Sequence, residues 1–87
     1  MVEATNPLVE EIRRVIVSAA RLEIEPGEIG LDQPLHGPDS LALNSIDIFD
    51  MVAELEGKLG IQVPDEEIPR LNSVAAILAF VESRRNA

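Results

Sequence analysis

The chain has no cysteine, tryptophan or tyrosine, and its 87 residues include one histidine and two phenylalanines. Without cysteine it can form no disulfide, no thiolate metal site and no cysteine nucleophile. A single histidine excludes metal sites that are built from several histidines. Two aromatic side chains are too few to form a stacking surface for the bases of a nucleic acid. The aliphatic and the acidic residues must therefore account for both the fold and the function.

Basic residues are scarce, with 7 lysines and arginines against 16 aspartates and glutamates and a formal net charge of −9. A protein of this charge repels phosphate backbones, so we expect no binding to nucleic acid. The same surface accelerates encounter with basic patches on other proteins. The charge therefore predicts protein partners.

Long apolar runs are also missing. No stretch approaches the roughly 20 apolar residues that are needed to cross a bilayer, and we expect that this is not a membrane protein. Residues 1–5 lack the basic region and apolar run of a signal peptide. The sequence therefore predicts a cytoplasmic protein.

Aliphatic residues are abundant, and apolar residues of all kinds make up 46% of the chain. This proportion is enough for one small hydrophobic core, and the length suits one domain rather than two. We therefore expect residues 1–87 to form a single domain.

Three stretches have the apolar spacing of amphipathic helices, at residues 7–22, 45–59 and 74–85, and no stretch alternates as a strand does. Asn6 and Ser73 are suitable N-caps, and Gly60 is a suitable end for the second helix. Residues 63–67 predict a short extended link into a helical turn that Asp65 caps and Pro69 cuts short. The expected fold is all-α, a bundle of three main helices plus one short helix.

A long loop joins the first two helices, because prolines and glycines interrupt any helix between residues 23 and 44. It carries six aliphatic side chains: Ile24, Ile29, Leu31, Leu35, Leu41 and Leu43. These should hold the loop against the core, so we expect it to be ordered. The single histidine, His36, lies in this loop; we expect it to be solvated and assign it no function.

The second helix has two apolar stripes with acidic residues between them. The stripe expected to face the core consists of Ile48, Met51, Val52, Leu55 and Leu59. The other consists of Ile46, Phe49 and Ala53, and the acids are Asp47, Asp50, Glu54 and Glu56. Both stripes could be buried in a central helix. The interleaved carboxylates favour an exposed apolar strip with an acidic rim, which is typical of a protein-docking face.

Ser45 stands where the second helix begins. The free N–H groups of a first helical turn favour an anion at this place, for example a phosphodiester on the serine. Serine is also a common N-cap, and Asn44 is a second candidate for that role. These residues alone leave both interpretations of Ser45 open.

The run LALNSIDIFDMVAELEGKLGIQVPDEE, from Leu41 to Glu67, resembles the acyl carrier protein family. The pattern of that family opens an acidic helix with Leu-Gly-x-Asp-Ser-Leu/Ile-Asp. A Leu-Glu pair, a Gly-Ile pair and a Pro-Asp-Glu-Glu link follow. The resemblance needs no gap from Leu41 to about Glu82, and with the first helix it covers most of the chain.

This resemblance implies that the chain is not an enzyme. It implies an acyl-carrier-like bundle in which 4′-phosphopantetheine from coenzyme A is attached to Ser45 and holds acyl groups as thioesters. The partners implied are a phosphopantetheinyl transferase and the acyl-loading, acyl-transferring or condensing enzymes of fatty-acid, polyketide or specialised lipid biosynthesis, with basic docking patches. We expect a monomer whose partner-binding residues are Asn44, Ile46, Asp47, Phe49, Asp50, Ala53, Glu54 and Glu56.

Two serines compete for the attachment. Asp39-Ser40-Leu41 matches the short motif letter for letter, whereas Asn44-Ser45-Ile46 does not. Gly60 follows Ser45 by 60 − 45 = 15 residues, which is the interval in the family. Ser40 would be five residues too early, and its place after Gly37-Pro38 is typical of a turn serine. We therefore assign the attachment to Ser45.

The sequence departs from the family pattern in several places. Asn44 stands where aspartate usually precedes the modified serine, and Ala42 stands where glycine is usual. These differences favour a discrete, specialised carrier over the primary fatty-acid carrier. Two alternatives stay open at this stage: an aminoacyl or peptidyl carrier with the same arm, and an acidic helical adaptor that has no arm.

Overall fold

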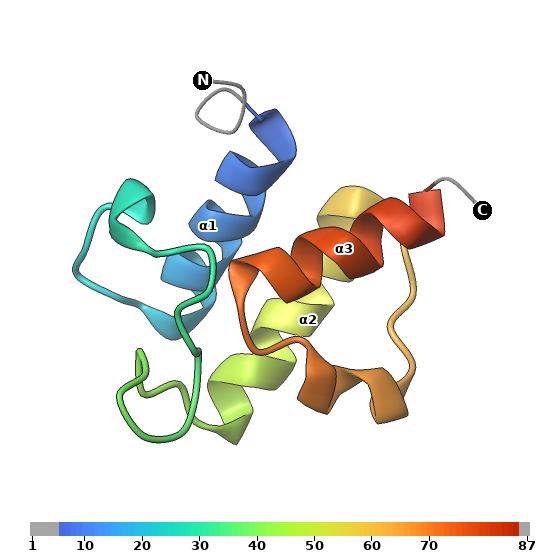
Figure 1. Cartoon of the computed structure of the whole chain (residues 1–87). Helices are drawn as coiled ribbons and strands as arrows, with labels where there is room; N and C mark the ends of the chain where they lie inside the picture. Colours follow the sequence, from blue (N-terminus) through green and yellow to red (C-terminus); the bar gives the residue numbers. More distant parts are fainter. Residues whose placement is uncertain (1–5, 86–87) are drawn as a thin grey trace.

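A computed structural model describes residues 6–85 and contains no strand among them. Its α-helices are α1 (Pro7–Ala20), α2 (Ser45–Leu59) and α3 (Val74–Arg85), and its short 3₁₀ helices are η2 (Pro26–Glu28) and η3 (Asp65–Arg70). α2 passes behind α3, and η3 lies below α3 (Figure 1). The predicted all-α bundle is confirmed, and η2 is an addition within the long loop. Residues 1–5, in which we found no signal-peptide pattern, lie outside the described residues.

α1 begins where the sequence predicts and ends two residues earlier. The side-chain oxygen of Asn6 accepts a hydrogen bond from the N–H of Leu8 at 2.9 Å, as an N-cap does. At the other end Arg21 adopts a left-handed conformation (φ 53°), and the N–H of Leu22 bonds to the carbonyl of Val17 at 3.0 Å. Leu22 remains half-buried after this turn. Its side chain therefore continues the apolar pattern beyond the end of the helix.

The segment after α2 differs from the prediction in its capping. Gly60 ends α2 in a left-handed conformation (φ 66°), as expected. Pro64 occupies the N-cap position of η3 without a side-chain hydrogen bond, and Asp65 lies in the first turn. The predicted Asp65 cap is therefore wrong. Pro69 lies inside η3 and not at its end, because η3 continues to Arg70. The last turn is closed by a hydrogen bond from the N–H of Leu71 to the carbonyl of Ile68 at 3.0 Å.

The long loop is held to the core, as its aliphatic side chains predict. Ile29 and Leu35 have no exposed surface, and Leu43 is 5% exposed. Two backbone bonds tie the loop to the beginning of α3: the N–H of Leu35 to the carbonyl of Asn72 (3.1 Å) and the N–H of Ala75 to the carbonyl of Leu31 (2.9 Å). The loop therefore has a fixed position beside the start of α3.

One core of aliphatic side chains joins the helices and the loop, and no polar side chain of the described residues is buried. The stripe of α2 that we expected to face inward does so: Ile48, Met51, Val52 and Leu55 are all at most 9% exposed, and Leu59 is partly buried against the core. α3 contributes Val74, Ile77 and Val81, and the hydroxyl of Ser73 caps this helix by accepting from the N–H of Ala76 at 3.1 Å. The core therefore fixes which side of α2 remains outside.

A carboxylate also holds the link that follows α2. Glu56 accepts a hydrogen bond from the N–H of Val63 at 2.8 Å, and its side chain is half-buried. The contact closes the turn between the last part of α2 and η3. Glu56, which the sequence placed in the docking face, therefore has a structural contact of its own.

This contact predicts a loss of stability in Glu56→Ala. A hydrogen bond to a charged group contributes about 1.5–3 kcal/mol, so we expect the free energy of unfolding to fall by roughly 1–2 kcal/mol for this partly exposed pair. Glu56→Gln retains an acceptor oxygen and should lose less than half of that. Urea unfolding measures both. Glu54→Ala is the matched control on the same helix, and an equal loss in this control would contradict the assignment.

The backbone at Ala42 is strained. Its φ is 65°, in the left-handed region that costs a residue with a side chain about 1–2 kcal/mol. The hydroxyl of Ser40 accepts the N–H of Ala42 at 2.9 Å and supports this conformation. Glycine, the residue usual here in the pattern described above, adopts it without the steric penalty.

We therefore expect Ala42→Gly to raise the free energy of unfolding by up to about 1 kcal/mol, since part of the relief is offset by the entropy of glycine. Urea unfolding measures the change. Ala53→Gly in the exposed part of α2 is the matched control and should lower stability by roughly 1 kcal/mol. A loss of stability in both variants would contradict the conformation described for Ala42.

Candidate functional site

Ser45 is the first residue of α2, and its side chain is exposed. The N-cap is Asn44, whose side-chain oxygen accepts from the N–H of Asp47 at 2.8 Å. The carboxylate of Asp47 accepts in return from the N–H of Asn44 at 3.2 Å, which completes a capping box. The interpretation of Ser45 as the cap is therefore wrong. Asn44 performs that role and leaves the serine hydroxyl at the open end of the helix.

Ser40 is engaged elsewhere. Its hydroxyl donates to the carbonyl of Gly37 at 2.6 Å and accepts from the N–H of Ala42 at 2.9 Å. These bonds make it part of a turn in the loop, away from the first turn of α2. The turn role expected for Ser40 is confirmed.

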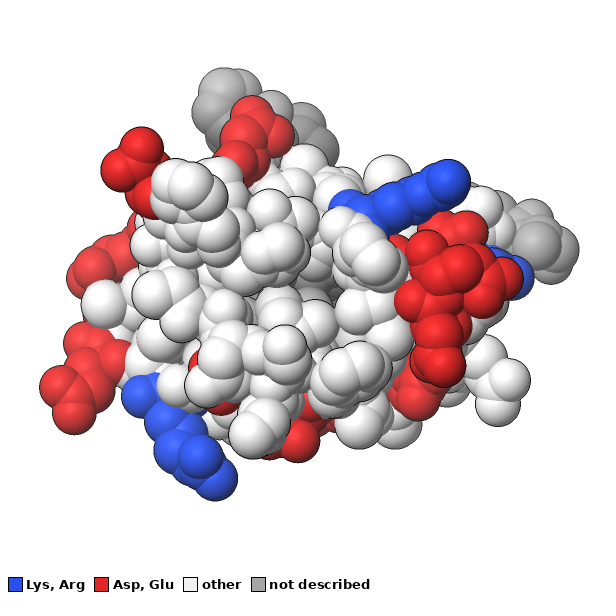
Figure 2. All heavy atoms as spheres, turned by 90° about the horizontal axis from the view of Figure 1, so that it is seen from below, with Lys and Arg blue, Asp and Glu red and all other residues white. Residues whose placement is uncertain are grey.

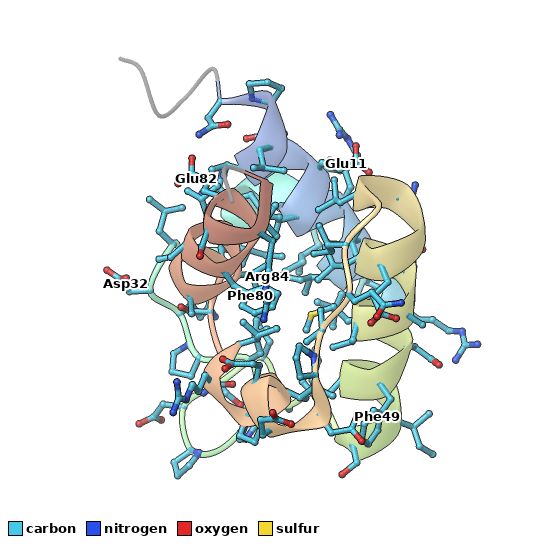
Figure 3. The ribbon with its side chains drawn as sticks, turned by 90° about the vertical axis from the view of Figure 1, so that its right-hand side faces the viewer. Glu11, Asp32, Phe49, Phe80, Glu82 and Arg84 are labelled. Atoms are coloured by element: carbon cyan, nitrogen blue, oxygen red, sulfur yellow. The ribbon has the colours of Figure 1, made fainter. Side chains whose placement is uncertain are left out.

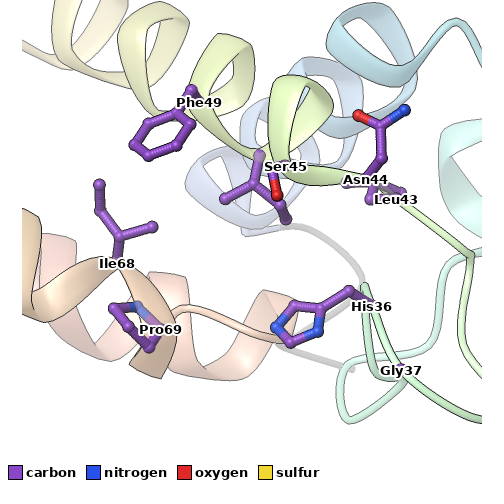
Figure 4. A pocket seen from close by; sticks show the side chains of 9 residues that line it. His36, Gly37, Leu43, Asn44, Ser45, Phe49, Ile68 and Pro69 are labelled. Carbon is purple, nitrogen blue, oxygen red and sulfur yellow. The ribbon is translucent and has the colours of Figure 1, made fainter.

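A pocket of about 610 Å³ opens beside Ser45. It lies between the long loop, the start of α2 and η3, and the hydroxyl of Ser45 faces it (Figure 4). Its lining consists of His36, Gly37, Leu43, Asn44, Ser45, Ile48, Phe49, Ile68 and Pro69. Figure 2 views the molecule from this end and shows a hollow surrounded by uncharged side chains, with acidic groups toward the margins. A group attached to Ser45 therefore has room to leave the protein and an apolar surface to lie against.

His36 belongs to this pocket, which the sequence did not indicate. Its ring lies across the hollow from Ser45 (Figure 4). Ser45 follows His36 by 45 − 36 = 9 positions in the chain, and no periodic pattern relates a loop residue to a helix start. The hydrogen bond from the N–H of Leu43 to the carbonyl of Leu35 (2.9 Å) brings the two segments together. Only the folded loop reveals this proximity.

The second apolar stripe of α2 lies outside the core, as predicted. Ile46 is 71% exposed and Phe49 is 57% exposed. Ala53 is exposed one turn further along the helix. Phe49 lies near the Ser45 end of the molecule, far from Glu11 at the other end (Figure 3). The alternative in which both stripes are buried is wrong, and α2 presents an unpartnered apolar strip.

The acidic residues of α2 divide into two kinds. Asp47 completes the capping box and Glu56 accepts from the N–H of Val63, so both carboxylates already have backbone partners. Asp50 is exposed and Glu54 is half-buried, and they lie one turn apart, at positions i and i+4. Because Ile46 precedes Asp50 by four residues, these acids continue along the border of the apolar strip.

No group of three or more His, Cys, Asp or Glu among residues 6–85 could hold a metal ion. Within the same part of the chain, no helix is long and apolar enough to cross a membrane.

Comparison with known proteins agrees with this geometry. The family profile described as "Phosphopantetheine attachment site" matches residues 10–81. The acyl carrier protein of Campylobacter hominis is 31% identical over 74 residues, which cover 85% of this chain and 89% of that protein. Both matches include α2 together with the Ser45 end and the pocket. The chain belongs to the acyl carrier protein family, whose cofactor is covalently attached 4′-phosphopantetheine.

Proposed function

We propose that this chain is a non-catalytic carrier that holds acyl groups as thioesters on a 4′-phosphopantetheine arm attached to Ser45. One observation carries the residue assignment: Ser45 is exposed at the first position of α2 and faces an open pocket, whereas the hydroxyl of Ser40 is bonded within a turn. Acyl carrier proteins are in general carriers without catalytic activity of their own. The arm supplies a terminal thiol, which a chain without cysteine lacks.

The residues around Ser45 suit a phosphodiester at this place. Asn44 fixes the beginning of α2, so the partial positive charge of the helix N-terminus is directed toward the substituent of Ser45. The asparagine forms the same hydrogen bonds to the first turn that an aspartate would form, and it differs in having no charge. The departure at position 44 therefore preserves the local structure and changes the electrostatics that a partner meets.

The pocket supports an acyl cargo in preference to an aminoacyl one. Its volume of about 610 Å³ lies in the range of small-molecule sites, and Leu43, Ile48 and Ile68 give it an apolar wall. None of its lining residues is an aspartate or glutamate that would pair with the ammonium group of an amino acid. Loading assays with fatty, malonyl and aminoacyl groups distinguish the two carriers.

The outer side of α2 is the proposed docking surface for partner enzymes. Ile46, Phe49 and Ala53 would provide apolar contact, and Asp50 and Glu54 would attract basic side chains. The partners we propose are a phosphopantetheinyl transferase and enzymes of fatty-acid, polyketide or specialised lipid biosynthesis. The single domain, the monomeric state and the cytoplasmic location stay predictions from the sequence.

The attachment is tested by intact mass spectrometry after incubation with coenzyme A, magnesium and a broad-specificity transferase. We expect wild type and Ser40→Ala to gain the mass of one phosphopantetheine, and Ser45→Ala to gain none. Modification of Ser45→Ala but not of Ser40→Ala would overturn the assignment. Absence of modification in all three would favour an adaptor that has no arm.

The docking surface is tested through the rate of the same modification. We expect the double variant Asp50→Asn, Glu54→Gln to lower the kcat/KM of the transferase by up to about thirtyfold at low ionic strength, because exposed charge pairs contribute at most about 1 kcal/mol each. The difference should vanish in high salt, where exposed charges are screened.

Asp32→Asn, in the long loop and on another side of the molecule from Phe49 (Figure 3), is the control for net charge. It should leave the rate unchanged. A rate that falls as much in this control as in the double variant would show that overall charge, and not this surface, is recognised.

A further inference from the structure

We propose that His36 is a second binding residue for the phosphodiester that joins the arm to Ser45, and that its protonated imidazole pairs with that anion. The proposal rests on the attachment to Ser45 proposed above. It assigns a function to the single histidine of the chain, for which the sequence indicated none.

The geometry places His36 on the wall of the pocket that faces Ser45. The hydroxyl of Ser45 and the ring of His36 face the same hollow from opposite segments, α2 and the long loop (Figure 4). A phosphate on that hydroxyl would share this hollow with the imidazole. The exposed ring is free of the core and can turn toward it.

The backbone on both sides of the pocket is held in place. The side-chain oxygen of Asn72 accepts from the N–H of His36 at 3.0 Å and from that of Leu35 at 3.2 Å. The bond between Leu35 and Leu43 then connects this part of the loop to the residue before Asn44. The position of the His36 backbone relative to Ser45 is thus fixed by the fold.

The charges around the pocket also favour this role. Although the chain carries a net charge of −9, His36 is the one residue among the nine that line the pocket whose side chain can become a cation or an anion at neutral pH. The acids nearest in sequence on the three segments, Asp39, Asp47 and Glu67, are not part of the lining. Asp47 is held by the N–H of Asn44, and Glu67 pairs with Arg70 at 3.8 Å. A cation that forms at His36 therefore faces no carboxylate of the pocket wall.

The chemistry of the two groups is complementary. A phosphodiester bears one negative charge throughout the neutral range, whereas an imidazole gains its proton between about pH 5 and 8. A charge-assisted hydrogen bond between them adds to the attraction from the N-terminus of α2. The base of the arm should consequently be held against the pocket at mildly acidic pH and be freer at higher pH.

The test uses holo protein, whose modification is first verified by mass. A ³¹P NMR titration from pH 5 to 8 follows the phosphodiester, which does not itself titrate in this range. We expect its resonance to shift with the protonation of His36 in wild type and to stay constant in His36→Gln. The imidazole resonances, unambiguous in a chain with one histidine, should show a titration midpoint at higher pH in the holo protein than in Ser45→Ala.

Asp39→Asn is the matched control, because it removes a titratable group from the same loop but not from the pocket wall. We expect the ³¹P resonance of this variant to shift with pH as it does in wild type. A ³¹P resonance that is constant in wild type, or one that shifts equally in His36→Gln, would overturn the proposal while leaving the attachment intact. A protein that takes up no phosphopantetheine would instead refute the attachment at Ser45.

Discussion

The capping box between Asn44 and Asp47 is the interaction on which the site depends. It fixes the residue at which α2 begins and so places Ser45 at the first helical position, with the hydroxyl outside the core. If Ser45 were the N-cap, its side-chain oxygen would accept a hydrogen bond from a backbone N–H of the first turn. A substituent on that oxygen would then weaken the capping bond. The side chain before the serine thus takes the capping role and leaves the hydroxyl of Ser45 without it.

A second constraint is the division of α2 into a buried side and an exposed side. Four aliphatic residues of α2 complete a core that contains no polar side chain among the described residues. Their burial determines the rotation of the helix, so Ile46 and Phe49 remain in solvent although both are large and apolar. An exposed apolar strip with polar residues at its border is typical of a protein–protein interaction site. Its place beside the proposed attachment residue supports recognition by partners as the role of this side of α2.

Most of the fold could be predicted from the sequence, and the errors have local physical causes. Helical spacing located α1, α2 and α3, because each must bury one apolar side. The end of α1 was wrong by two residues because Leu22 packs inward from a left-handed turn, which a periodic pattern does not distinguish from a helix. The predicted cap of η3 was wrong because the 3₁₀ turn begins directly after Pro64. It therefore lacks the side-chain hydrogen bond that Asp65 would form as the N-cap of an α-helix. In the site, the sequence separated Ser45 from Ser40 through the interval to Gly60.

The sequence by itself determined the helices, the acidic charge and the family, and it predicted Ser45 as the attachment residue, since each depends on local residue types or on spacing along one segment. Only the tertiary structure decided which of the acids of α2 are available, because Glu56 is engaged by the distant N–H of Val63. Only the tertiary structure formed the pocket and brought His36 to it. The long loop and the start of α2, which follow one another in the chain, form its walls together with the distant η3, and packing against the common core brings them together.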